Sequence, residues 1–590
     1  MASYNHGTHN DTQGLAMFKQ SYKHKQREIF DWDFSLPNQS KLCESMWHTL
    51  RSEVFDKVNQ EAFSVLFPSH TGRPNSPINQ IVTLLVIKEL YDWSFRELAE
   101  QMYWNIGVMY ACGVTIGEST VSLRTLSNFI QYLREYQDET GIDLFNLEFN
   151  RLIKGQIESF RLNTKIARTD STQIATNVVA YNRLQLVIES IKRLHRVVSE
   201  MDQKYISMLC PDYIKYDADN YVSLLTSNDV KAEFPKAGAC ILSIIGQFQD
   251  KYEDKAEWQM LIRIFAEQYD VDTSDDDGPK ASMKSSDDKS SNDVRAIDDS
   301  EATLRSKSGI NHLGYVANVV ETCDPEADLN LICDVTLCTN NTSDGEMLRD
   351  ALDNLVSHRL TELEELHFDG GYGGPILDDK LRKHSINCVQ TGIRGVKCDA
   401  SMHVELVKDI YYVTCAEKQR IACVRGRKGY NATFDRSKCE LCGRFSKCPA
   451  RQLKSGNYVY YLKDNDIPKR LRLSYINTIP MNRRSLRSGV EATIRQFKCK
   501  TKAGKTRLRG LYRHKLWFTM LALAINIKRI FNYTINVSPK CIAGQLSRLS
   551  CVFLASIRQF WAFQMSFRRS LKQYTAISRI FDCHTSLTMQ

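Results

Sequence analysis

The stretch HLGYVANVVETCDPEADLNLICDVTLC, residues 312–338, holds two runs rich in β-branched and apolar residues on either side of the turn-like sequence DPEAD. Runs of this kind, bounded by turn residues, predict two β-strands. The pattern that follows predicts a helix over residues 345–360, a strand ending in a glycine turn over 365–371, and a further strand over 386–392. Strands that alternate with helices indicate a mixed α/β domain.

A helical region is expected before this α/β domain. Residues 36–150 contain HTGRPNSPINQIVTLLVIKELYDWSFRELAEQM, in which Ile78, Ile81 and Leu85 follow helical spacing after an Asn-Ser-Pro start signal. A helical domain that binds DNA and a plain helical bundle both fit this pattern. Residues 1–35 are polar, and we expect them to form a flexible N-terminus.

The α/β domain is expected to span residues 155–535, with three interruptions. Residues 180–270 contain the amphipathic run LQLVIESIKRLHRVV and predict a helical insertion. Residues 271–301 are rich in Asp, Glu and Ser and poor in apolar residues, which predicts a disordered acidic loop. A cysteine-rich subdomain is expected over 398–460. The basic, helical tail over 536–590 could pack on the core, mediate dimerisation or lie on DNA.

The composition is that of an ordinary soluble globular protein, with 43% hydrophobic and 25% charged residues. The N-terminal sequence contains no apolar core of the kind that a signal peptide needs. No apolar run approaches the roughly 18 residues that a membrane helix requires. We therefore expect a cytosolic or nuclear protein without a membrane partner, whose 18 Cys residues are reduced thiols rather than a disulfide framework.

Positive charge is concentrated near the C-terminal end of the α/β domain. Residues 481–530 contain 14 Lys and Arg residues against one acid, Glu491, although the whole chain carries a net charge of only +9. A basic stretch of this kind is an electrostatic footprint for nucleic acid. A solvated helical face, or a contact with an acidic protein, would also fit it.

Two acids stand where predicted strands end. Asp170 in RTDSTQ follows an extended segment, and Asp369 in HFDGGYGG precedes glycines that permit close approach of a phosphate backbone. Cleavage of phosphodiesters with two divalent cations needs carboxylates from separate elements that converge on one point. Either Asp could also simply begin a turn or cap a helix, where Asp is common.

Glu491 is the third candidate, because it is an acid within an otherwise cationic helix. Arg487, Glu491 and Lys498 are spaced so that they project from one face of that helix. An acid in such a place is expected if it holds a metal while its neighbours hold phosphates. An ordinary Arg–Glu helix pair, worth a few tenths of a kcal/mol, also fits the spacing.

The motifs of this chain occur in the order found in one known family. They are HTGRPNSPINQIVTLLVIKELYDWSFRELAEQM, RTDSTQIATN, DDSEATLRSKSGINHLGYVANVVE, HFDGGYGG, a cysteine cluster, and RSGVEATIRQFK followed by RLRGLYRHKLWFTMLALAINIKRI. On these motifs the chain resembles the DDE transposases of bacterial insertion sequences, in particular the IS1182-like members of the IS4/IS5 group.

The resemblance implies an RNase H-like core built on a mixed five-stranded sheet, with Asp170 on its first strand, Asp369 on its fourth and Glu491 on the following helix. The three carboxylates would hold Mg²⁺ or Mn²⁺. The protein would hydrolyse one strand at each end of a DNA element, and the exposed 3′-OH would then attack target DNA. The implied partners are double-stranded DNA, as terminal inverted repeats and as target, and a second copy in a homodimer. The implied location is the cytoplasm, on the nucleoid.

The family signature around the third acid is Tyr, two residues, Arg, three residues, Glu, six residues, Lys or Arg. Arg487, Glu491 and Lys498 match it, whereas Arg484 stands in the place of the Tyr. The resemblance implies that Arg487 and Lys498 hold the phosphates of the DNA end, Arg by its planar fork and Lys as a point charge. We expect Arg484 and Arg495 to contact DNA as well.

Cys439, Cys442 and Cys448 stand as C-x2-C-x5-C in KCELCGRFSKCPAR, and Cys415 and Cys423 lie upstream. A C-x2-C pair with two further thiolates suffices for a tetrahedral structural Zn²⁺ site, for which Cys415 is the expected fourth ligand. A set of free thiols in a compact subdomain fits the looser spacing as well.

Three functions remain open on the sequence alone. The first is an active transposase, and the second is a nuclease of the same fold that no longer joins DNA ends. The third is a zinc-containing DNA-binding protein of transposase origin without catalytic activity. The presence of all three acids argues against the third.

Overall fold

The structure is a computed structural model. It describes residues 17–22, 41–67, 73–115, 118, 121–273, 278–285, 287–307, 309–391, 402–443, 445–502 and 504–536. The predicted flexible N-terminus lies outside these ranges except for residues 17–22, and the predicted basic tail lies outside them except for residue 536. Among the helices that are described, none is long and apolar enough to cross a membrane.

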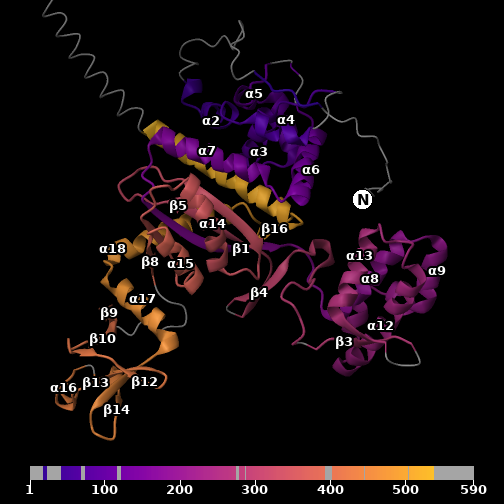
Figure 1. The fold of residues 1–590 in the computed structure, drawn as a ribbon. Coiled ribbons are helices and arrows are strands. Elements are labelled where there is room, and N and C mark those ends of the chain that lie inside the picture. Colours follow the sequence, from indigo (N-terminus) through magenta and orange to yellow (C-terminus); the bar gives the residue numbers. More distant parts are fainter. Residues whose placement is uncertain are drawn as a thin grey trace, which may run out of the picture.

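A mixed β-sheet forms the centre of the molecule (Figure 1). Five strands lie side by side in the order β6 (Ile332–Thr339), β5 (Ile310–Thr322), β1 (Ile166–Thr176), β7 (Glu365–Phe368) and β8 (Asn387–Gln390). The β6–β5 and β5–β1 pairs are antiparallel, whereas the β1–β7 and β7–β8 pairs are parallel. This order and these directions are compatible with an RNase H-like core.

The sheet contains seven strands rather than the predicted five. The first additional strand, β4 (Thr303–Lys307), pairs with the same edge of β5 as β6 does, but with its first residues. The second, β16 (Lys505–Thr506), pairs with the same edge of β1 as β7 does, but with its last residues. Both are short and largely polar, so neither carries the apolar alternation by which a strand is found in sequence.

Helices cover the sheet. In the sequence, α14 (Asp344–His358) follows β6 and α15 (Pro375–Lys383) follows β7. The N-terminal region contributes α3 (Ile78–Tyr91), which is buried on nearly every face. One continuous hydrophobic core joins these helices, the sheet and the helical residues 511–536, which run alongside α7 in Figure 1. The remaining N-terminal helices are α2 (Met46–Leu50), α4 (Phe95–Trp104), α5 (Ile106–Ala111), α6 (Leu123–Thr140) and α7 (Leu144–Phe160).

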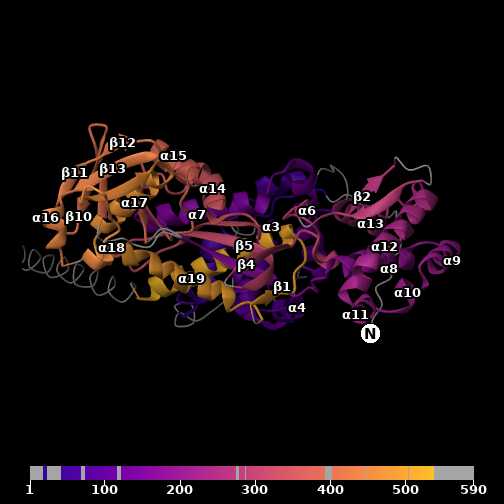
Figure 2. The same ribbon diagram turned by 90° about the horizontal axis from the view of Figure 1, so that it is seen from below.

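The residues between β1 and β4 form a second helical unit with its own hydrophobic core. Figures 1 and 2 show it at the opposite end of the central sheet from the small sheets that contain β9–β15. Its longest helix, α12 (Ser227–Phe248), begins with a capping box made by Thr226 and Asp229. The other helices are α8 (Arg183–Val197), α9 (Glu200–Leu209), α10 (Pro211–Lys215), α11 (Ala218–Ser223) and α13 (Ala256–Gln268).

The described part of the acidic segment, residues 271–273, 278–285 and 287–301, differs from its prediction as a disordered loop. It forms an antiparallel hairpin of β2 (Tyr269–Asp272) and β3 (Lys280–Met283), and Val294 is fully buried in the helical unit. The carboxylates of Asp299 and Glu301 accept hydrogen bonds from the backbone amides of residues 510 and 511, where the 511–536 helix begins. The acids therefore stabilise the positive end of a helix, which composition alone does not reveal.

Two small sheets lie between β8 and α17 (Ile467–Thr478), around a hydrophobic core that includes Val413 and Phe434. One sheet has the order β11-β10-β9 and the other the order β12-β13-β15-β14. Their strands are β9 (Met402–Val407), β10 (Ile410–Cys415), β11 (Arg420–Ala422), β12 (Val424–Gly426), β13 (Gly429–Phe434), β14 (Arg451–Gln452) and β15 (Tyr458–Lys463).

Candidate active site

Asp170 lies in the middle of β1, where its side chain is only 12% exposed. One carboxylate oxygen accepts the amide of Ser171 at 2.9 Å, and the other accepts Nη2 of Arg487 at 2.7 Å. Burial raises the pKa of the Asp170 carboxyl, Arg487 and the Ser171 amide oppose this rise, and the charge of Asp369 adds to it. Asp170 is therefore a desolvated carboxylate that depends on a nearby positive charge.

Asp369 follows the last residue of β7. In the parallel ladder Arg168 of β1 stands beside His367 of β7, so the same register continued by two residues brings Asp170 beside Asp369. The Asp369 carboxylate accepts the amide of Gly371 at 2.7 Å, which fixes the turn after the strand. Asp170, in the middle of β1, thus lies beside Asp369 at the carboxyl end of the neighbouring parallel strand β7, where ligands commonly bind in α/β sheets.

Glu491 lies on α19 (Gly489–Lys498), which follows α18 (Met481–Arg484) and the 3₁₀ turn Ser485–Ser488 without a break. Its side chain is 60% exposed and accepts Nη1 of Arg487 at 3.1 Å. The Arg487 guanidinium therefore joins the first predicted acid to the third. Together with the electrostatic effect of Asp369 on Asp170, this contact brings all three predicted carboxylates into one place.

The predicted DNA contacts are less uniform in their surroundings. Arg487 is held by two carboxylates and is largely buried, whereas Arg495 and Lys498 are exposed on α19 and Arg484 is half-buried. Among the described residues, none of the last three takes part in an ion pair. Three side chains on or next to α19 are therefore available as cations, and the contact of all four with DNA remains a prediction.

A cavity of about 530 Å³ lies along the second half of β1, and its lining begins at Thr172, two residues after Asp170. Thr172 and Thr176, which share a strand face with Asp170 because they alternate along it, line the cavity together with Lys498 and Lys505. Two lysines, from α19 and β16, therefore give this cavity a positive charge.

The three carboxylates suit a hard divalent cation, since Mg²⁺ and Mn²⁺ prefer oxygen ligands. Across the part of the chain that the structure describes, no group of three or more His, Cys, Asp or Glu side chains is arranged at metal-binding distances. The Arg487 guanidinium, placed between Asp170 and Glu491, supplies the positive charge that these carboxylates need. The donor set therefore fits a divalent cation in chemistry, and the structure identifies no particular ion.

A fourth carboxylate, Asp344, lies beside the site and is missing from the sequence-based prediction. A Cβ atom on Gly371 would lie 3.0 Å from Oδ1 of Asp369 and 3.2 Å from Oδ2 of Asp344. Asp344 is the first residue of α14 and has Arg305 at 3.5 Å. The only sequence signal is the helix-start pattern NTSDGE, which also fits a plain capping residue.

The predicted zinc ligands surround a second cavity, of about 290 Å³, in the small sheets. Cys415, Cys439, Cys442 and Cys448 all line it, whereas Cys423 does not. Burial raises the pKa of the Cys439 thiol, and the charges of the other three thiols add to the rise. The four cysteines are free and line the same cavity, so a cation bound there would relieve the repulsion between their thiolates.

Comparisons with known proteins match two separate parts of the chain. Residues 34–132 match the model of a transposase domain, DUF772, and residues 414–531 match the model of a transposase DDE domain. The second match contains Arg487, Glu491 and Lys498. No curated protein and no solved structure matches the chain. Two segments of this chain are thus similar to transposase domains, and together they support a DNA transposase of the DDE type that moves insertion elements.

Proposed function

We propose that the protein is a transposase of the IS1182-like group that cleaves DNA at the ends of its element and joins the released 3′-OH ends to target DNA. The observation that carries this proposal is the proximity of Asp170 on β1, Asp369 at the end of β7 and Glu491 on α19, with Arg487 joining the first acid to the third. The match of residues 414–531 to a transposase DDE domain supports it independently. No observation favours the alternative of a DNA-binding protein without catalytic activity.

In this proposal Asp170, Asp369 and Glu491 hold Mg²⁺ or Mn²⁺. When bound, the ions supply Lewis-acid stabilisation of the charge that develops on the scissile phosphate and activate the attacking oxygen. The protein's own contribution is to hold three carboxylates on separate elements, on β1, directly after β7 and on α19. Burial of Asp170 strengthens this arrangement, because a desolvated carboxylate interacts more strongly with a cation than a hydrated one.

The basic residues on and near α19 are proposed to hold the DNA backbone. Lys498, Arg495 and Arg484 would contact phosphates, and Lys498 would do so in the cavity along β1, which it lines together with Lys505. Arg487 would add a phosphate contact at the site itself, beside Asp170 and Glu491. The proposed partners are duplex DNA, as terminal inverted repeats and target, and a second copy of the chain, since two DNA ends must be brought together.

Lys498→Ala is expected to weaken binding of duplex DNA by a similar factor for every sequence. The salt dependence should fall as well, with the slope of log K against log salt smaller by about 0.9, the value for one lost phosphate contact. Fluorescence anisotropy over a salt series measures both quantities. Lys236→Ala, which removes a lysine paired with Glu233 in the helical unit, is the control. An unchanged slope for Lys498→Ala would exclude this lysine as a phosphate contact.

Cys415, Cys439, Cys442 and Cys448 are proposed to hold one structural Zn²⁺. We expect about one zinc per chain in the purified protein, measured by emission spectroscopy, because a four-thiolate site is complete. Cys415→Ser should lose the metal and unfold the small sheets, since metal binding and folding are coupled in such sites. Cys423→Ser is the matched control, as Cys423 lies outside the cavity, and it should keep the zinc. Retention of zinc by Cys415→Ser would contradict this ligand set.

The transposase proposal is tested with the purified protein and a duplex that carries one end of the element. With Mg²⁺ present we expect a cut that leaves a 3′-OH, followed by covalent joining to a target plasmid. Cleavage without joining would leave a nuclease of the same fold. Specific binding to the end without cleavage in either Mg²⁺ or Mn²⁺ would favour the non-catalytic alternative.

A further inference from the structure

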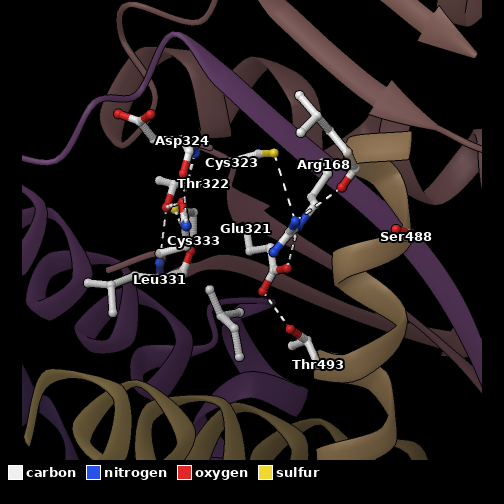
Figure 3. Close-up of polar contacts among 12 residues, drawn as sticks. Arg168, Glu321, Thr322, Cys323, Asp324, Leu331, Cys333, Ser488 and Thr493 are labelled. Carbon is white, nitrogen blue, oxygen red and sulfur yellow. Dashed lines mark hydrogen bonds and ion pairs between the residues drawn. The ribbon is translucent and has the colours of Figure 1, made fainter. Parts of the chain in front are cut away.

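Glu321 is a fully buried acid near the end of β5. It lies between the sheet and α19. Its Oε1 accepts Nε of Arg168 at 2.6 Å, and its Oε2 accepts the hydroxyl of Thr493 at 2.7 Å, as Figure 3 shows. Oε2 also accepts Nη1 of Arg529 at 2.9 Å. One carboxylate therefore joins four elements of the fold: β1, β5, α19 and the helical residues 511–536.

The partners of Glu321 hold the catalytic helix on both sides of its functional residues. Arg168 donates from Nη1 to the backbone carbonyl of Leu486 at 3.1 Å, one residue before Arg487. Thr493, two residues after Glu491, is buried and also accepts Nη2 of Arg529 at 2.5 Å. The short run that carries Arg487 and Glu491 is thus fixed at both of its ends.

The sequence of α19 accommodates this arrangement. Gly489 lies directly against the guanidinium of Arg168, and a Cβ atom at that position would collide with it. A larger residue would therefore displace either the Arg168 guanidinium from its contacts or the helix from β1. Arg168 and Asp170 are two residues apart on one strand, so their side chains share a face. The strand face that presents Asp170 to Arg487 also holds the helix that carries Arg487.

The charges make this anchor a stiff one. A buried carboxylate is costly unless its lone pairs are satisfied, and Glu321 is satisfied only when Arg168, Thr493 and Arg529 all stay in place. A shift of α19 along or away from the sheet would break several charge-assisted hydrogen bonds together. The position of α19 therefore depends on Glu321. Among the described residues, Glu321 makes no contact with Asp170, Asp369 or Glu491.

We propose that Glu321 is a positioning residue. Through Arg168 and Thr493 it fixes α19 against β1, and so sets the place of Glu491 relative to Asp170 and Asp369. The catalytic consequence rests on the proposed function, whereas the anchoring of α19 does not. Groups that orient metal ligands typically change metal affinity or activity by roughly 10- to 100-fold when they are lost.

The test uses Thr493→Val, because this change removes one hydroxyl and leaves the Arg168–Glu321 ion pair in place. We expect the Mn²⁺ concentration for half-maximal cleavage of the element-end duplex to rise by roughly tenfold or more. Binding of the same duplex without divalent metal should stay unchanged. Thr493→Ser keeps the hydroxyl and should restore the wild-type Mn²⁺ dependence. Thr83→Val removes a buried hydroxyl that bonds within α3, and it serves as the matched control.

Hydrogen exchange provides a second readout that requires no activity. We expect faster exchange of the α19 amides in Thr493→Val than in wild type, with α3 and α14 unchanged. Wild-type exchange in α19 together with wild-type Mn²⁺ dependence would overturn the proposal. If the wild-type protein cleaves no DNA, the proposed function fails, and the exchange of α19 still decides whether Glu321 and Thr493 anchor the helix.

Discussion

Asp170→Asn is expected to slow cleavage of the element-end duplex by roughly 1,000-fold or more, since loss of metal stabilisation worth several kcal/mol has this effect. Asn keeps the size of Asp and removes its charge. Asp170 is the most buried of the acids that Arg487 joins, so few other groups can replace its charge at the site. Arg487 should remain next to Glu491, and the binding of DNA should therefore change little.

The measurement is a single-turnover cleavage assay in Mg²⁺, with DNA binding followed in parallel. Asp353→Asn is the matched control, because it makes the same chemical change on α14, where Asp353 pairs with Lys380 and His384 at the surface. Its cleavage rate should equal that of wild type. A rate for Asp170→Asn within tenfold of wild type would remove Asp170 from the metal site.

Glu321→Ala is expected to lower the free energy of unfolding by about 3–5 kcal/mol, the usual cost of breaking a buried ion pair by removing one partner. The substitution leaves the guanidinium groups of Arg168 and Arg529 without their carboxylate, beside a small cavity. Denaturation by urea, followed by tryptophan fluorescence, measures the change, since Trp517 is buried in the core and lines the same cavity as Phe497 and Lys498 of α19.

Glu364→Ala is the control for this stability prediction. Glu364 pairs with Lys165 at 2.9 Å, but both side chains are more than half exposed. Exposed pairs contribute about 0–1 kcal/mol, so the control should be close to wild type. Equal effects of the two substitutions would show that the Glu321 cluster is no more than a surface-type pair.

The central part of the fold could be predicted from local sequence. The runs at 312–321 and 330–338 are rich in apolar and β-branched residues, and the structure has β5 at Ile310–Thr322 and β6 at Ile332–Thr339. β4 and β16 could not be found in this way, because they have no apolar pattern of their own and form by pairing with the longer strands β5 and β1.

The acidic segment shows the limit of composition as a guide. Its apolar residues are few, yet Val294 and Ala296 are fully buried, and Asp299 accepts the hydroxyl of Tyr315 at 2.6 Å. Val294 is buried in the core of the helical unit, Ala296 is buried in the core around the central sheet, and Tyr315 belongs to β5. The order of the segment therefore comes from tertiary contacts that no local pattern contains.

The candidate site was predictable where its residues stand out against their surroundings. Glu491 is a lone acid in a cationic stretch, and Asp170 and Asp369 end or interrupt predicted strands. The contacts of Glu321 that hold α19 could not be predicted, because its partners are far away in the sequence. Arg168 is separated from it by 153 positions, Thr493 by 172 and Arg529 by 208. Its only local signal is an acid at the end of the apolar run YVANVV, where a buried charge needs a partner.

The central claim is that Asp170, Asp369 and Glu491 form one site for a divalent metal. The most direct measurement is anomalous X-ray diffraction from crystals of the protein with element-end DNA and Mn²⁺. The account predicts a manganese peak in contact with carboxylate oxygens of all three residues, and its loss in crystals of Asp170→Asn. A manganese peak at the scissile phosphate that is held by other residues, or full occupancy in Asp170→Asn, would contradict it.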